Sequence, residues 1–407
     1  MKQKVLTAIL GLLVLATVPV LASEPAETGE KFAVEAIYRH FSSTYTPRDL
    51  LRRVQKEATY IAGKFEKSPE KGRIALDEYN LPFSRWNRMD GLHPHTQIND
   101  FEKGWIEAHP NPKLHKLRFI ENLYQKFKDH AGRLPIVEAF DTITRMPEGF
   151  FSYQYTTWDR AITGITSPMY VLNAYVDIPG TPYHICGHMP YAAGSVAEMD
   201  RTIEYLNQMA PYWSGPEQPS DFPFEMRYRY FETHFTPRDL LKIAQDRAEY
   251  IGNEFKKDVA QGEKAIDEFN LPFSRWNRLD GFRPFAQIHD TDKALIRAHP
   301  NPALHKLLNK PGLLAKFKDH SGRLVGVEAA EKVKVSPAGA WLFQYTTFIR
   351  SLTKITAPSY ELDVYVRIPD TPYVVHAIMP YRAYSLEEMA LTVNYLDDMT
   401  AYWTDAD

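Results

Sequence analysis

Cysteine is almost absent from this chain, because Cys186 is the only one among 407 residues. A single thiol cannot form an intramolecular disulfide, so the fold must be held by its own apolar core. The net charge of −3 leaves no basic excess, and binding to nucleic acid is therefore not expected. The chain also lacks a glycine-rich phosphate loop and a repeated pairing of a nucleophile with a base. We therefore expect neither an enzyme nor a bound cofactor.

Long apolar runs are missing after the first 22 residues. Those residues begin with Lys2 and Lys4, continue with the apolar stretch Val5–Val18 and end in small residues at Ala22. This order is typical of a secretory signal peptide, so we expect residues 1–22 to be cleaved after Ala22 and the mature protein to be periplasmic. The alternative is a retained membrane anchor, but the run is shorter than the ~20 residues that span a bilayer.

What the chain does contain is a repeat of about 180 residues, written twice at a constant offset of 190. No insertion or deletion is needed along the match. The repeated segments are TPRDLL at 46 and 236, NLPFSRWNR at 80 and 270, AHPNP at 108 and 298, KFKDH at 126 and 316, and QYTT at 154 and 344. We therefore predict module 1 at 31–213 and module 2 at 223–407. They are joined by a linker at 214–222 that is rich in proline, glycine and serine.

Each module is expected to be α+β, with a long N-terminal helix and a five-stranded antiparallel sheet. Thr46 and Pro47 mark the start of the long helix, because a hydroxyl suits the N-cap and proline the first helical position. The remaining elements follow from hydrophobic spacing. They are a short helix at 70–79, a hairpin of strands at 93–99 and 104–109, strands at 150–157, 170–178 and 183–189, and a closing helix that ends near Trp213.

The strand at 170–178 shows the clearest alternation of side chains. One face is apolar, while the other carries Tyr175 among polar groups, and module 2 repeats this parity around Tyr365. Tyr155 and Tyr345 are a second pair of strand tyrosines at the same offset. All four are candidates for lining a pocket, and core packing is an equally good explanation.

The order of these elements and four short segments resemble the type-2 single Cache domain, an extracytoplasmic sensor module. The segments are LPFSRWN from 81, EAHPNP from 107, KDHAGR from 128 and GHMPY from 187. The resemblance covers nearly all of both modules. It implies a PAS-like fold with strand order 2-1-5-4-3, the long helix on one face of the sheet and a ligand pocket on the other.

The resemblance also implies a function. Members of the family bind small molecules, often organic acids, and usually belong to transmembrane chemoreceptors or kinases. This chain departs from that pattern, because it has no transmembrane exit and no cytoplasmic signalling domain, so we expect a separate membrane-bound signalling partner. A lysine that often precedes the fourth strand is replaced by Ser167-Pro168 and Ala357-Pro358, which puts the usual mode of carboxylate binding in doubt.

Two arginine–tryptophan pairs are candidates for the pocket: Arg85-Trp86 and Arg275-Trp276. An arginine fork suits a carboxylate, and the neighbouring indole could stack on the ligand. Alternatively, the arginine ties the helix end to the sheet and the tryptophan fills the core. His109 and His299 in the AHPNP turns are expected to be mainly structural hydrogen-bonding groups.

Module 1 carries histidines that module 2 lacks. His184, Cys186 and His188 alternate along the last strand, and His93 and His95 along the first, so we expect these side chains to face one pocket. In module 2 the corresponding positions are Val374, His376, Ile378, Arg283 and Phe285. The histidines and the thiolate could hold a transition metal or haem, but a polar pocket is the preferred interpretation.

These observations favour a periplasmic small-molecule-binding or sensory protein. The alternatives are a scaffold that keeps the fold without a ligand, and a metal or haem protein that uses the module 1 histidines. Because the modules differ at the candidate positions, we expect them to differ in ligand, or one of them to be only structural.

Overall fold

The computed structural model describes residues 29–158, 160–214, 227–228, 230–231, 234–347, 350 and 354–404. The predicted signal peptide and its cleavage site lie outside these residues, as does the predicted linker beyond Ser214. Within the described part of the chain, no helix is both long and apolar enough to span a membrane.

Both modules have the α+β architecture that the sequence predicts. Module 1 consists of α1 (Gly29–Thr44), α2 (Pro47–Phe65), α3 (Pro69–Asp77), η1 (Glu78–Asn80), β1 (His95–Asp100), β2 (Trp105–Ala108), η2 (Pro112–Leu117), α4 (Pro135–Ile143), β3 (Phe150–Thr156), α5 (Arg160–Thr163), β4 (Met169–Asp177), β5 (Tyr183–Pro190) and α6 (Val196–Trp213). Module 2 consists of α8 (Pro237–Lys257), α9 (Val259–Asp267), η3 (Glu268–Asn270), β6 (Phe285–Asp290), β7 (Leu295–Ala298), η4 (Pro302–Leu307), α10 (Val325–Val335), β8 (Ala340–Thr346), β9 (Ser359–Arg367), β10 (Tyr373–Pro380) and α12 (Leu386–Thr404).

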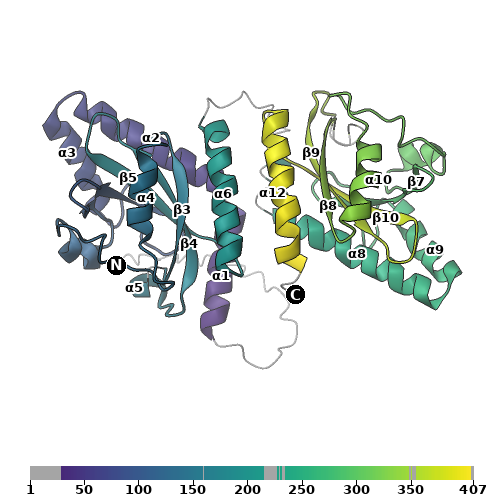
Figure 1. Ribbon diagram of the computed structural model, residues 1–407, viewed down its shortest axis with the longest axis horizontal. Coiled ribbons are helices and arrows are strands. Elements are labelled where there is room, and N and C mark those ends of the chain that lie inside the picture. The colour runs from purple at the N-terminus through teal and green to yellow at the C-terminus, as the bar shows by residue number, and fades with distance from the viewer. Residues whose placement is uncertain are drawn as a thin grey trace, which may run out of the picture.

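The two sheets have identical topology. Their strand orders are β2-β1-β5-β4-β3 and β7-β6-β10-β9-β8, and all neighbouring strands are antiparallel. This order is the one that the family resemblance implies. Figure 1 shows the two sheets on either side of α6 and α12, which pack against each other in the middle of the molecule.

The long helix of each module begins at a capping box. The hydroxyl of Thr46 accepts a hydrogen bond from the amide of Asp49, and the Asp49 carboxylate accepts one from the Thr46 amide. Thr236 and Asp239 repeat this arrangement at the start of α8. The apolar side of α2 then packs on β4 and β5, which fixes which face of the sheet the helix covers.

Gly187 on β5 lets α2 pack closely against the sheet. A Cβ atom at this position would lie 2.7 Å from Val54 and 3.0 Å from Leu50. Because neighbouring residues of a strand point to opposite faces, Cys186 and His188 must point away from α2.

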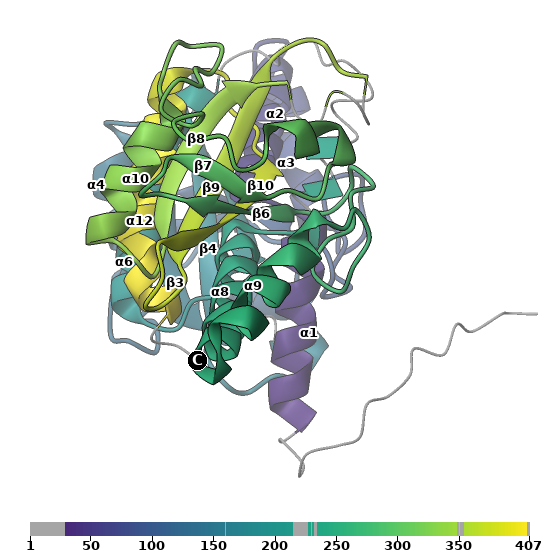
Figure 2. The ribbon, with the colours of Figure 1, turned by 90° about the vertical axis from the view of Figure 1, so that its right-hand side faces the viewer.

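The opposite face of the sheet is also buried, which corrects the expected contrast between an apolar and a polar face. Every residue of β4 except Asp177 is buried. Tyr175 packs in a second apolar cluster with Phe150 and Ile143, and Ile143 belongs to α4. The sequence analysis did not predict α4, or its counterpart α10 in module 2. Figure 2 shows α8 and α9 on one side of the second sheet and α10 on the other.

Candidate functional site

The candidate site is the face of each sheet that points away from the long helix; we call it the distal face. In module 1, β1 and β5 pair in the register His95–His188, and β4 and β5 in the register Asn173–His188. Residues directly opposite each other share a face, so these three side chains meet on the distal face.

Three histidines gather there. The ring centroids of His95 and His188 lie 4.9 Å apart, and those of His95 and His109 lie 5.6 Å apart. His188 Nδ1 lies 2.7 Å from Asn173 Oδ1, so this ring nitrogen is the donor and Nε2 carries no proton in the neutral ring. Nε2 of His188 is buried and has no hydrogen-bond partner among the described residues. A buried acceptor of this kind is costly unless it is satisfied by water or a ligand.

These imidazoles are neutral at physiological pH. Burial lowers the pKa of His95 to about 3. Burial lowers the pKa values of His109 and His188 well below the usual range as well, and the neighbouring histidines add to the effect. The group of three histidines on the distal face of module 1 is therefore polar but uncharged.

The other predicted module 1 residues lie apart from this group. His93 precedes β1 and bonds through Nδ1 to Asp90 at 2.9 Å, so the expected strand over 93–99 begins two residues late, after Pro94. His184 pairs with Asp177 at 3.0 Å and stacks on Phe101.

The thiol of Cys186 is fully buried in the apolar cluster with Tyr175, and burial raises its pKa. In the described part of the chain, no group of three or more His, Cys, Asp or Glu side chains is arranged to hold a metal ion. The metal or haem alternative therefore has no geometric support from these residues.

Module 2 carries a different polar group on its distal face. Phe285 and Ile378 stand in place of His95 and His188, while His376 stands in place of Cys186. His376 Nε2 lies 3.0 Å from Asp363 Oδ1, and its Nδ1 accepts a hydrogen bond from Gln287 Nε2 at 2.7 Å. The ring of Tyr365 stacks on His376 with centroids 4.0 Å apart.

Three further residues of this face were missed by the sequence analysis: Glu361, Asp363 and His289. Glu361 and Asp363 alternate on β9 and are 5% and 0% exposed. The ring of His289 lies 4.9 Å from that of His376, and its Nε2 is buried without a partner among the described residues. A comparison of the two copies could have indicated Glu361 and Asp363, because they stand where module 1 has Val171 and Asn173.

The strand tyrosines divide between the two faces. Tyr175 and Tyr365 lie on the distal face, where both are buried. Tyr155 pairs with Tyr170 in the register of β3 and β4, and Tyr170 belongs to the face that α2 covers. Tyr345 pairs with Tyr360 in the same way, so Tyr155 and Tyr345 do not line the distal face.

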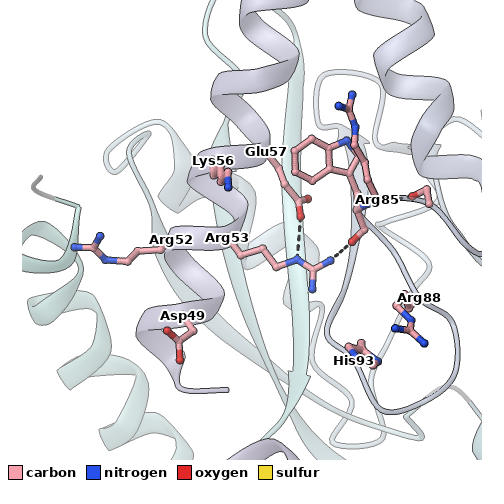
Figure 3. A pocket seen from close by; sticks show the side chains of 10 residues that line it. Asp49, Arg52, Arg53, Lys56, Glu57, Arg85, Arg88 and His93 are labelled. Atoms are coloured by element: carbon pink, nitrogen blue, oxygen red, sulfur yellow. Dashed lines mark hydrogen bonds and ion pairs between the residues drawn. The ribbon is translucent and has the colours of Figure 1, made fainter. Parts of the chain in front are cut away.

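A groove of about 470 Å³ lies on the helix side of module 1, between α2 and the loop that carries Arg85 and His93 (Figure 3). Its walls carry five cationic and two acidic side chains: Arg52, Arg53, Lys56, Arg85 and Arg88, with Asp49 and Glu57. Several of these charges are already paired. Arg53 bonds to Glu57 at 2.9 Å and to the Pro94 carbonyl oxygen at 2.8 Å, so its guanidinium is used in binding the loop to α2.

The arginine–tryptophan pairs are held by acidic side chains of the chain itself. Arg85 Nε and Trp86 Nε1 both donate to Glu78 Oε2, at 3.0 and 2.9 Å. Arg275 and Trp276 bind Glu268 with the same two distances. This arrangement agrees with the structural alternative for these pairs, and they do not reach the distal face. Arg283 is exposed in the loop before β6, where His93 stands in module 1.

Comparison with known proteins gives structural likenesses only. No family model matches this chain. No curated protein matches it either. One similar solved structure is the periplasmic sensor domain of a chemotaxis protein, with 16% identity, a TM-score of 0.26 and coverage of 40% of this chain and 94% of that domain. Another is a Cache chemosensory domain described for carboxylic acid recognition, with 15% identity, a TM-score of 0.28 and coverage of 39% of this chain and 98% of that domain. At this identity the Cache family remains a resemblance for this chain.

Proposed function

We propose that this chain is an exported small-molecule-binding protein of the sensory type, with one ligand site on the distal face of each module. A membrane-bound signalling partner would read the bound state, as the sequence resemblance implies. Ligand binding shifts such an equilibrium only if the ligand has different affinities for the two conformations of the protein.

The observation that carries this proposal is the polarity of two faces that a purely structural sheet would fill with apolar side chains. Buried polar groups are normally satisfied by hydrogen bonds, yet Nε2 of His188 and Nε2 of His289 have no partner in the described part of the chain. A bound solute with polar atoms would supply the missing partners, and the surrounding aromatic rings would bury its apolar part.

The two copies support this interpretation because their scaffolds agree while their distal faces differ. Capping boxes, strand order and register are the same in both modules. The polar groups on the distal faces are different in number, type and position. This pattern fits a duplicated binding scaffold whose two sites take different ligands.

A solute screen on the full chain tests the proposal. Thermal shift followed by calorimetry should find at least one solute that stabilises the protein, because a ligand that binds only the folded state raises its stability. Two substitutions, each to the residue that the other module has at the equivalent position, should show which module binds the solute. His188→Ile should abolish binding to module 1, and His376→Cys should abolish binding to module 2. A broad screen with no stabilising solute, or binding that survives both substitutions, would remove the support for these sites.

A further inference from the structure

The distal faces of the two modules differ in buried charge. On β9 of module 2, Glu361 and Asp363 are both buried, whereas β4 of module 1 has Val171 and Asn173 at these positions. On β4 of module 1 the carboxylate of this face is Asp177, which is only half-buried and pairs with His184, whereas β9 of module 2 carries two buried carboxylates.

Glu361 has a cationic neighbour within the chain. Arg227, which is 4% exposed, lies close enough to counteract the rise in the pKa of Glu361 that burial causes. Module 1 has Ile37 in place of Arg227 and Val171 in place of Glu361, so both charges are absent there together. Arg227 therefore acts as the counter-charge of Glu361.

Burial raises the pKa of Asp363 well above its usual range, and Arg323, the cation that counteracts this rise, already binds Glu328 and the Phe343 carbonyl oxygen. Oδ2 of Asp363 is buried and has no hydrogen-bond partner among the described residues. His376, which bonds to Oδ1 of Asp363, accepts a bond from Gln287 at Nδ1, so the proton of His376 resides on Nε2 and the ring is neutral. Burial lowers the pKa of His376 to about 3, which keeps the ring neutral at physiological pH. A buried carboxylate beside a neutral ring is stabilised by a cation.

A second group on this face also lacks a partner. The ring of His289 lies next to His376, and its Nε2 is buried and unpartnered within the described residues. Together with Asp363 it provides polar atoms for a ligand that has several hydrogen-bond donors or acceptors.

We propose that the distal face of module 2 binds a small primary ammonium compound beside Asp363, and that the distal face of module 1 does not. An ammonium group carries three donors and one positive charge, so it can form charge-assisted hydrogen bonds with Asp363. The inference rests on the proposed function, because it names the class of ligand for one of the two proposed sites.

Calorimetry on the full chain with propylammonium and propionate tests this charge preference, since the two probes have similar apolar parts and opposite charges. We expect binding of propylammonium that weakens at least tenfold in Asp363→Asn. Asparagine already occupies the equivalent position 173 in module 1, so this variant should fold. The control Asp246→Asn removes an exposed carboxylate of α8 and should leave the affinity for propylammonium unchanged.

The outcomes separate this inference from the proposed function. If propionate or a neutral solute binds, and His376→Cys abolishes that binding, module 2 is a ligand site but the ammonium assignment is overturned. Equal affinity of wild type and Asp363→Asn for propylammonium also overturns it. If no cationic, anionic or neutral solute binds either module, the proposed function fails together with the inference.

Discussion

The rings of Tyr205 on α6 and Tyr395 on α12 stack on each other, with centroids 4.1 Å apart and planes within 8° of parallel. The two residues are equivalent in the repeat, and their hydroxyls make reciprocal contacts. The hydroxyl oxygen of Tyr205 lies 3.1 Å from that of Thr392, and the hydroxyl oxygen of Tyr395 lies 3.1 Å from that of Thr202. The modules therefore meet through the same surface of each copy, as subunits do in a twofold-symmetric dimer.

The tryptophans near the ends of these helices extend the same symmetry. Trp213 Nε1 donates to Glu388 at 3.3 Å, and Trp403 Nε1 donates to Glu198 at the same distance. Only a surface whose two halves are built from the same sequence repeats its contacts in this way. The duplication thus supplied the interface between the modules as well as the modules themselves.

The tyrosine stack should show measurable energetic coupling. We expect Tyr205→Leu and Tyr395→Leu each to lower stability, and the double variant to lower it by about 1 kcal/mol less than the sum, because the second change no longer breaks the stack. Chemical denaturation of the four proteins measures this cycle. Tyr60 packs against Trp86, away from α12, so Tyr60→Leu combined with Tyr395→Leu should be additive. Strict additivity for the stacked pair would contradict a direct interaction.

The close packing of α2 against Gly187 predicts that one substitution destabilises the protein and that a second substitution partly restores its stability. Gly187→Ala should cost about 1–3 kcal/mol, because the new methyl group would lie within 2.7 Å of Val54. Module 2 has Ala377 and Ala244 at the two equivalent positions, and both are fully buried. Adding Val54→Ala should therefore recover part of the loss, as measured by the melting temperature. No recovery would mean that Leu50, which would lie 3.0 Å from the new methyl group, sets the limit instead of Val54.

The ion pair between Arg53 and Glu57 in the wall of the groove is replaced as a unit in module 2. In module 1 Glu57 accepts hydrogen bonds from Arg53 and from Tyr79 at 3.0 Å. In module 2 the positions hold Ile243, Arg247 and Phe269, and Arg247 binds the Trp276 carbonyl oxygen just as Arg53 binds that of Trp86.

Arg53→Ile alone should therefore cost about 3–5 kcal/mol, because it leaves Glu57 buried and unpaired. The triple variant Arg53→Ile, Glu57→Arg and Tyr79→Phe should cost less, since it recreates the arrangement of module 2. Urea unfolding of both variants checks this. A triple variant as unstable as the single one would show that the module 2 arrangement depends on other differences.

The buried histidines predict a loss of stability on acidification. The pKa of His95 is about 3 in the folded protein and about 6.5 when unfolded, so only the unfolded state gains a proton between these values. The histidine contribution to stability should be constant above about pH 7 and fall as the pH drops below 6.5, by about 1.4 kcal/mol per pH unit for each such histidine. The raised pKa values of the buried Glu361 and Asp363 act in the opposite direction, so a variant is needed to isolate the contribution of one histidine. His95→Phe, the residue of module 2, should reduce this slope in unfolding experiments between pH 6 and 5. An unchanged slope would mean that His95 is accessible to protons when folded.

Much of the fold could be predicted from local rules. Thr46 and Pro47 specify a helix start by capping chemistry alone, and alternation along 170–178 specifies a strand. The sequence analysis missed α4 and α10, and with them the burial of Tyr175, because a tyrosine facing polar neighbours along one strand reveals nothing about a helix that covers it.

The candidate site could be predicted only in part, for two physical reasons. His93 and His95 alternate in sequence, but Pro94 between them cannot donate to a β-ladder, so the strand starts only at His95. His184 and His188 share a face, yet they stand four residue steps apart along the strand, a distance of about 13 Å that is too long for one metal ion. Alternation along the strand does place Glu361 and Asp363 on the face of Tyr365, but it cannot show that both carboxyl groups are buried.

Histidine-ring NMR of the full chain, recorded with and without a stabilising solute, tests the central claim most directly. If the ligand sites are the distal faces, signals of His95 and His188, or of His289 and His376, should shift, while His93 beside the groove stays unchanged. Shifts of His93 with unchanged distal-face signals would place the site in the groove and contradict the account.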